Sequence, residues 1–166
     1  MPRSGARLIF AILPLLLAGC IYGFAGGGLP PNIRSVAVLP FENQTPLAPL
    51  QHELLEEMRG EVEGRLGLRE ASEKRADAIV RGRIVSYEPD IPVAYSADPS
   101  RASTAQRKVQ ITVDVEILEQ STGRSLWTRK GLMRDGTYTE GAEERGRSDA
   151  IKKIVSDVIA GAQSQW

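Results

Sequence analysis

The chain has 166 residues, of which 42% are hydrophobic and 25% are charged, and its formal net charge at pH 7 is zero. This composition is typical of a globular domain and argues against a fully disordered chain. The balanced charge provides no overall attraction to nucleic acid, so a nucleic-acid partner is not expected. A single cysteine and a single histidine exclude an internal disulfide framework and most zinc sites.

The N-terminus has the three-part pattern of a secretory signal peptide, which we place at residues 1–19. Arg3 and Arg7 form a basic start, an apolar run covers residues 8–17, and small residues follow. That run is about half the length that a bilayer-spanning helix needs, so a transmembrane anchor is not indicated.

The segment Leu17-Ala18-Gly19-Cys20 resembles the bacterial lipobox, in which the cysteine is lipidated and becomes the first mature residue. A thiolate is a good acceptor for acyl transfer, and two or more lipid chains hold a protein stably on a membrane. We therefore expect Cys20 to be lipidated, with palmitate among its acyl chains. The alternative is an ordinary signal peptide followed by a stray cysteine. In lipoproteins, Asp after this cysteine commonly signals inner-membrane retention, so Ile21 is compatible with the outer membrane.

Residues 20–34 are rich in glycine and proline and are predicted to be a lipidated, flexible tether. Residues 35–166 are predicted to be the folded domain. Its first element is a short apolar strand, Ser35–Leu39, which Pro40 stops. A helix is predicted from Pro49 to Leu66 because apolar residues recur there at helical spacing. The glutamates on its opposite face indicate a solvated surface rather than a metal site.

A second strand is predicted over residues 76–87; a parallel pairing with the first strand would form a βαβ unit. Residues 88–106 contain three prolines and many small polar residues, which predicts a long loop that is either functional or disordered. Ile91 and Tyr95 within it either pack on the sheet or contact a partner.

The alternation of apolar and polar residues over 109–117 is the clearest strand signal in the chain. A turn at 120–123, a return strand over 126–133 and a final helix over about 140–163 follow. Gly141 and Gly146 weaken the start of this helix, so its first residue is expected between 140 and Ser148. The prediction is therefore an α+β domain, a two-layer sandwich of two helices on one four-stranded mixed sheet, in the order β-α-β-β-β-α.

No catalytic set is found in the sequence, so neither enzymatic activity nor a cofactor or metal is expected. His52 stands alone at the start of a helix, and the cysteine is used for lipid. Basic residues at the loop and on the last two strands are candidates for contacts with lipid phosphates, because guanidinium groups suit phosphate. The candidates are Arg101, Arg107, Lys108, Arg129 and Lys130. The alternative is ordinary cross-strand ion pairing with Asp114 and Glu116.

Several segments together resemble the LptE family of lipopolysaccharide-assembly lipoproteins. They are Cys20 to Phe24, Gly28 to Ile33, Val36 to Thr45, Ala76-Asp77-Ala78, the strand 109–117, and Gly123 with Leu126-Trp127. The resemblance implies a non-enzymatic protein on the periplasmic side of the outer membrane, held by its lipid anchor. Members of the family sit inside the β-barrel of LptD, help it to assemble and bind lipopolysaccharide. The basic candidates above would then contact lipopolysaccharide.

A second resemblance leads to a different class of function. Val36 to Asn43 is also similar to the opening strand of periplasmic lipoproteins related to CsgG and to the activators of peptidoglycan synthases. The protein would then be a secretion subunit or an enzyme regulator. The segments before this strand and the long last two strands favour the LptE family.

Overall fold

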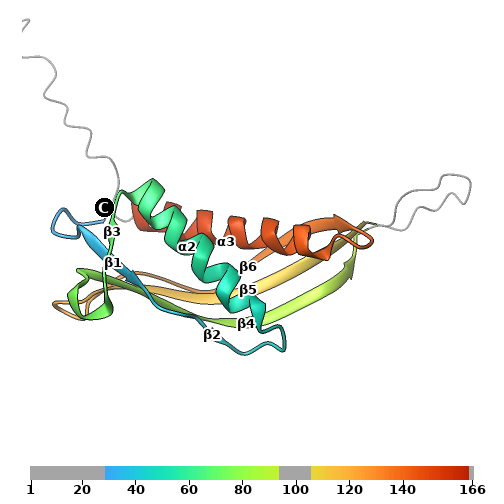
Figure 1. Cartoon of the computed structure of the whole chain (residues 1–166), viewed down its shortest axis with the longest axis horizontal. Coiled ribbons are helices and arrows are strands. Elements are labelled where there is room, and N and C mark those ends of the chain that lie inside the picture. The colour runs from blue at the N-terminus through green and yellow to red at the C-terminus, as the bar shows by residue number, and fades with distance from the viewer. Residues whose placement is uncertain (1–28, 94–105, 165–166) are drawn as a thin grey trace, which may run out of the picture.

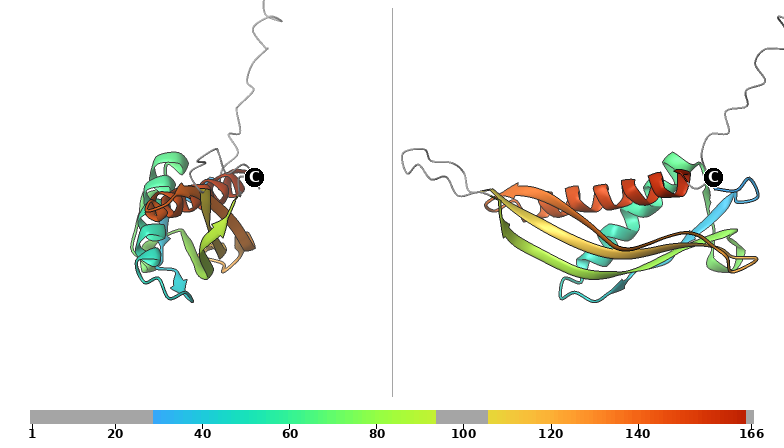
Figure 2. Two further views of the ribbon diagram at one scale, coloured as in Figure 1. Left: turned by 90° about the vertical axis from the view of Figure 1, so that its right-hand side faces the viewer. Right: turned by 180° about the vertical axis from the view of Figure 1, so that it is seen from behind.

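The computed structural model describes residues 29–93 and 106–164. The predicted signal peptide, Cys20 and two residues of the long loop, Tyr95 and Arg101, lie outside these ranges. The described chain is an α+β domain in which two helices, α2 (Pro49–Leu66) and α3 (Glu143–Ser164), cover one face of a single sheet (Figure 1). Among the described residues, no helix or further sheet covers the opposite face (Figure 2).

The sheet is mixed and has more strands than predicted. Its strands are β1 (Ser35–Val38), β2 (Glu42–Asn43), β3 (Arg69–Glu70), β4 (Ala78–Pro92), β5 (Gln106–Glu119) and β6 (Ser125–Thr139), with the short 3-10 helix η1 (Glu73–Arg75) before β4. Their order is β3-β1-β4-β5-β6, and β2 also pairs with β4. β1 runs parallel to β3 and β4, as expected for a βαβ unit, whereas β4, β5 and β6 are antiparallel.

The predicted layers, helix number and mixed pairing are confirmed, but the predicted number of four strands is wrong. β2 and β3 were missed because two-residue strands are too short to show a period in the sequence. The loop predicted from residue 88 to 106 is also shorter, because β4 continues to Pro92 and β5 already begins at Gln106. A register shift between Glu88 and Ile91 lets this proline-containing segment remain paired with β5.

The core lies between the sheet and the helices. β5 contributes every second residue to it, namely Val109, Ile111, Val113, Val115 and Ile117, all of which are buried. α2 starts at Pro49 and ends at Leu66 as predicted, and Gly67 caps it with a positive φ of 65°, the usual conformation after a helix C-terminus. α3 starts at Glu143, within the predicted range of 140 to 148, and Gly141 with a φ of 81° forms the turn that precedes it.

Two glycines bring α3 into backbone contact with β6. A Cβ added at Gly136 would lie 1.9 Å from the carbonyl oxygen of Gly146, and one added at Gly146 would lie 3.0 Å from that of Gly136. At the other end of α3, the indole of Trp127 lies on Gly161, where a Cβ would approach the ring to 2.4 Å. Glycine is required at positions 136 and 146 because helix and strand lie too close for a side chain, and at position 161 because the Trp127 indole occupies the space.

β6 forms one edge of the sheet, and positively charged side chains bind some of its carbonyl oxygens. Arg134 Nη1 donates to the oxygen of Met133 at 2.7 Å, and Lys153 Nζ from α3 donates to that of Asp135 at 2.9 Å. Arg134 also forms an ion pair with Asp157 of α3 at 2.5 Å. Gly131, with a φ of 62°, lies where the register of β5 and β6 shifts. These features limit pairing with a further strand at this edge.

Candidate functional site

The sheet face turned away from the helices carries two ion pairs between β4 and β5. Arg81 Nη2 lies 3.0 Å from Glu116 Oε2, and Arg83 Nη2 lies 2.7 Å from Asp114 Oδ2. In each ion pair the two residues lie directly opposite each other on β4 and β5, where opposite charges stabilise the strand pairing modestly. The backbone N–H of Gly131 also donates to Asp114 at 2.7 Å. That hydrogen bond and the Arg83 guanidinium hold the pKa of Asp114 below its usual value.

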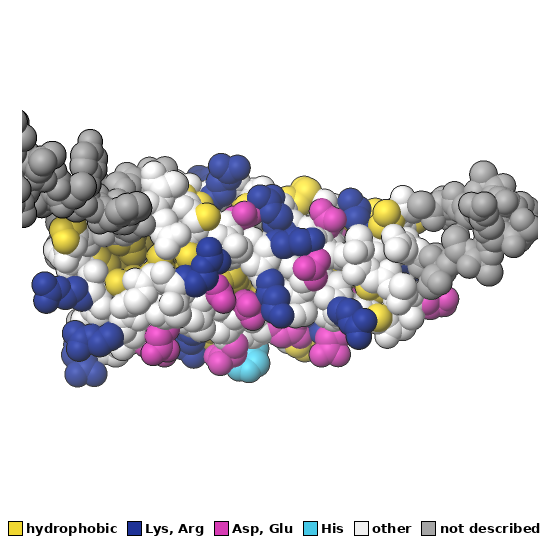
Figure 3. Space-filling model, turned by 90° about the horizontal axis from the view of Figure 1, so that it is seen from above, with side chains coloured by type: hydrophobic (Ala, Val, Ile, Leu, Met, Phe, Trp, Pro, Cys, Tyr) yellow, Lys and Arg dark blue, Asp and Glu magenta, His cyan; other side chains and the backbone are white. Residues whose placement is uncertain are grey.

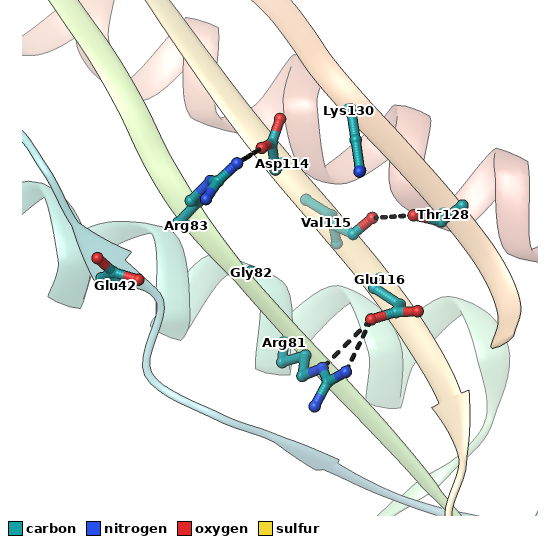
Figure 4. Close-up of a pocket in the computed structure, with 9 residues that line it drawn as sticks. All are labelled: Glu42, Arg81, Gly82, Arg83, Asp114, Val115, Glu116, Thr128 and Lys130. Carbon is teal, nitrogen blue, oxygen red and sulfur yellow. Dashed lines mark hydrogen bonds and ion pairs between the residues drawn. The ribbon is translucent and has the colours of Figure 1, made fainter. Parts of the chain in front are cut away.

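A hollow of about 460 Å³ lies between these two ion pairs (Figure 4). The backbones of Gly82 and Val115 form its floor, because the Val115 side chain is buried on the helix side and Gly82 has none. The remaining lining residues are Arg81, Arg83 and Lys130 with positive charge, Glu42, Asp114 and Glu116 with negative charge, and Thr128. Three positive and three negative groups balance, so the hollow does not select for a ligand of either charge.

The basic residues singled out from the sequence do not form one cluster among the described residues. Lys108 and Lys130 lie on the outward face, but the register places them roughly 20 Å apart along the strands at about 3.4 Å per residue. Arg107 and Arg129 are paired in register with the buried residues Tyr138 and Val115, so they occupy helix-side positions. Arg107 also forms an ion pair with Asp90. The fifth candidate, Arg101, lies outside the described residues.

Asp114 and Glu116 do form cross-strand ion pairs, but with Arg83 and Arg81 of β4 rather than with the candidate basic residues. These two arginines were not singled out in the sequence. The available signal was their spacing: they flank Gly82 in a strand, so both side chains must point to the same face. His52, which stood alone in the sequence, is exposed on α2.

On the helix side, a polar network joins α2, α3 and β4. The Arg147 side chain is only 13% exposed, and its Nε and Nη2 donate to the two carboxylate oxygens of Glu53 at 2.7 and 3.0 Å. The Tyr87 hydroxyl donates to Glu143. Burial and this hydrogen bond to a carboxylate raise the pKa of Tyr87 to about 12. No local sequence pattern indicates this network, because Glu53 and Arg147 are 94 residues apart.

These arrangements stabilise the fold and provide polar surfaces. Within residues 29–93 and 106–164, no group of three or more His, Cys, Asp or Glu side chains is placed to hold a metal ion. Neither described helix combines the length and the apolar content that crossing a bilayer requires.

The model of the LptE family, described as lipopolysaccharide-assembly, matches residues 33–160, from just before β1 to the last turns of α3. The chain belongs to the LptE family. The match includes both helices and all six strands, so it concerns the whole described fold of this LptE-family chain. The resemblance noted in the sequence is thereby confirmed.

Solved structures share the fold of this LptE-family chain at low identity. The PelC dodecamer from Paraburkholderia phytofirmans is 18% identical with a TM-score of 0.53, over 83% of this chain and 95% of that one. A Xanthomonas campestris protein is 10% identical with a TM-score of 0.53, over 83% and 91%. A putative lipoprotein from Caulobacter crescentus is 12% identical with a TM-score of 0.50, over 75% and 88%. No curated protein matches the sequence.

Proposed function

We propose that this LptE-family chain is a non-enzymatic lipoprotein on the periplasmic side of the outer membrane. It occupies the lumen of an LptD-like β-barrel, helps the barrel to assemble and assists lipopolysaccharide insertion at the cell surface. The observation that carries this proposal is the family match over residues 33–160. Because that match spans every described element, it supports a function of the whole folded body rather than of one motif.

The surface of the body is compatible with such a role. A protein inside a large, water-filled barrel lumen is surrounded by polar groups on all sides. The outward sheet face presents paired charges, as at Arg83 and Asp114, and α2 presents a face rich in glutamates, such as Glu57 and Glu63. A body with polar side chains on both layers suits a lumen better than it suits a flat apolar interface.

Lipid anchoring rests on Cys20 and is tested by Cys20→Ala in the full-length chain. The variant accumulates uncleaved or in the soluble fraction, whereas the wild-type chain is cleaved and fractionates with the outer membrane. Wild-type-like processing and membrane fractionation of the variant would exclude Cys20 as the attachment site. Metabolic labelling with a palmitate analogue provides an independent readout, because the chain contains one cysteine.

The barrel partner is tested by photo-crosslinkers placed on opposite layers of the body. Met133, 47% exposed, reports on the outward sheet face, and Glu63, exposed on α2, reports on the helix layer. A chain enclosed by a barrel captures the same LptD-like protein from both positions, and also from Tyr95 and Arg101. Capture from one layer only would show that the chain docks beside the barrel and would contradict its proposed position in the lumen.

The alternative is a periplasmic lipoprotein of the CsgG-like or peptidoglycan-synthase-activator type. PelC, which shares the fold, forms a dodecamer, so a homo-oligomer is the observable form of this alternative. Purification of the chain from detergent-solubilised membrane decides between the two. Recovery of a one-to-one complex with a barrel protein supports the proposal, whereas recovery of a homo-oligomer or of a penicillin-binding protein supports the alternative.

A further inference from the structure

One end of the body is lined by exposed positive side chains. It is the end at which the described chain begins, and there the loop before β1, the strand β3, the helix η1 and the β5–β6 turn lie together (Figure 1). Four exposed cations of these segments are Arg34, Arg69, Lys74 and Arg75, and we name these four the basic end. Arg124 of the β5–β6 turn is exposed as well, but it forms an ion pair with Glu119. Figure 3 shows Lys and Arg side chains at this left-hand end of the body.

Most carboxylates near the basic end are engaged in hydrogen bonds or ion pairs of the fold. Asp77 accepts hydrogen bonds from Ser35 Oγ at 2.7 Å and from the backbone N–H groups of Ser35 and Arg34 at 2.9 and 3.0 Å. These bonds, led by the one from Ser35 Oγ, lower the pKa of Asp77. Glu119 is only 6% exposed and accepts from Asn32 and Thr122 at 2.8 and 2.7 Å.

The remaining acidic residues leave a positive excess at this surface. Glu70 forms an ion pair with Arg59 of α2 at 3.1 Å, and Glu73 is the exposed carboxylate beside Lys74. The side chains of Arg69 and Lys74 form no hydrogen bond or ion pair with any other described residue. The basic end therefore presents more free positive than free negative charge to an approaching partner.

A hollow of about 220 Å³ adjoins these cations, between η1 and the β5–β6 turn. Lys74 and Arg75 line it together with Asn32, Gln120 and Ser121, which offer amide and hydroxyl groups. Asp77 also lines it, but its carboxylate is already bound by Ser35. Two cations beside neutral donors suit a phosphate group.

The proposed lipid attachment point is close to this end of the body along the chain. Nine residue steps separate Cys20 from Leu29, which span at most about 30 Å when extended at roughly 3.3–3.6 Å per residue. β6 alone is 15 residues long, or about 50 Å at roughly 3.4 Å per residue. A membrane-inserted lipid on Cys20 thus holds the basic end nearer to the bilayer surface than the far end of the sheet.

We infer that the basic end docks on the phosphate headgroups of anionic phospholipids in the leaflet that holds the lipid anchor. This inference rests on the proposed lipidation of Cys20. The anchor supplies attachment, and Arg34, Arg69, Lys74 and Arg75 supply orientation, so that the long axis of the sheet points away from the membrane. Each basic residue at an anionic membrane surface contributes roughly fivefold in affinity, so loss of Lys74 and Arg75 weakens the preferred orientation by roughly 30-fold.

The test uses the full-length lipidated chain in phosphatidylethanolamine vesicles, with or without phosphatidylglycerol. A fluorophore is attached at Ser125→Cys or Thr139→Cys, which are exposed positions at the two ends of β6. Labelling is selective because the native cysteine carries the lipid. A lipid with a nitroxide on its headgroup quenches whichever end lies at the surface. With phosphatidylglycerol present, the Ser125 position is quenched several-fold more than the Thr139 position.

The charge-reversed variant Lys74→Glu/Arg75→Glu lowers this difference to the value that the wild-type chain shows in vesicles without phosphatidylglycerol, where only the anchor acts. High salt, at which the Debye length falls to about 3 Å, has the same effect on the wild-type chain. The matched control Arg145→Glu/Lys152→Glu changes two exposed residues of α3 by the same charge and retains it. Equal quenching at both ends, or a difference that is as large in Lys74→Glu/Arg75→Glu as in the wild-type chain, overturns the inference while leaving the anchor intact. Failure of the wild-type chain to remain with the vesicles refutes the anchor, and with it the inference.

Discussion

The contact between Gly136 on β6 and Gly146 on α3 makes a strong prediction for the substitution Gly136→Ala. The new Cβ would lie 1.9 Å from the Gly146 carbonyl oxygen and 2.9 Å from the Ala150 backbone nitrogen. Such contacts are essentially never shorter than 3.0 Å, so strand and helix must separate by at least about 1.1 Å. The obstacle is backbone and cannot rotate away. Because α3 buries eight residues, we expect a loss of about 3 kcal/mol in the free energy of unfolding, the upper end for overpacking.

The assay is thermal unfolding of the chain followed by far-UV circular dichroism. For a domain of this size, about 3 kcal/mol corresponds to a decrease of roughly 6–12 °C in Tm. The matched control is Gly64→Ala on α2, where an added Cβ meets nothing within 4 Å. Replacing glycine by alanine in an exposed helix interior contributes about 1 kcal/mol, so Tm rises by roughly 2–4 °C. A Gly136→Ala protein as stable as the wild type would refute the close approach of α3 and β6.

Three further predictions concern the polar groups. Arg147→Ala leaves the Glu53 carboxylate without its bidentate partner and lowers the free energy of unfolding by about 2 kcal/mol. If the losses of Arg147→Ala and Glu53→Ala simply added in the double variant, the two side chains would not interact. Because the folded-state pKa of Tyr87 is raised from 10.0 to about 12, its contribution to stability is complete below pH 10 and is lost between pH 10 and about 12. Tyr87→Phe removes this part of the alkaline loss in urea unfolding, and an unchanged pH profile would contradict it. Arg129→Ala/Lys130→Ala weakens lipopolysaccharide binding in a direct titration, because both exposed side chains are candidates for contacts with its phosphates. An unchanged affinity would exclude both residues as lipopolysaccharide contacts.

The sequence predicted those parts of the fold that depend on local patterns. The alternation in β5 and the apolar spacing and initial proline of α2 were sufficient to define both elements. The turn glycine Gly123 was also predicted, and its φ of 68° shows why glycine is used there. Each of these signals lies within one short segment, so no knowledge of the tertiary structure was needed.

The features that were not predicted depend on residues far apart in the chain. β2 and β3 become strands only because β4 and β1 lie beside them. The extension of β4 to Pro92 depends on pairing with β5 across a register shift. Arg107 and Lys108 are neighbours in sequence but occupy opposite faces of β5, and no periodicity argument placed Arg147 beside Glu53. The candidate surfaces were therefore harder to predict than the elements that carry them.

The hydrogen bonds from side chains to the carbonyl groups of the β6 edge affect how copies of the chain associate at high local concentration. The carbonyl oxygen of Asp135 accepts a hydrogen bond from the Lys153 ammonium, and that of Met133 accepts one from Arg134. Both carbonyl groups are therefore less available to a strand of a neighbouring copy. Molecules confined to a surface meet each other far more often than molecules free in a volume, and unprotected strand edges would then grow into fibrils. Because side chains of the same molecule occupy these carbonyl groups, edge-to-edge pairing between copies is limited even when many molecules share one surface.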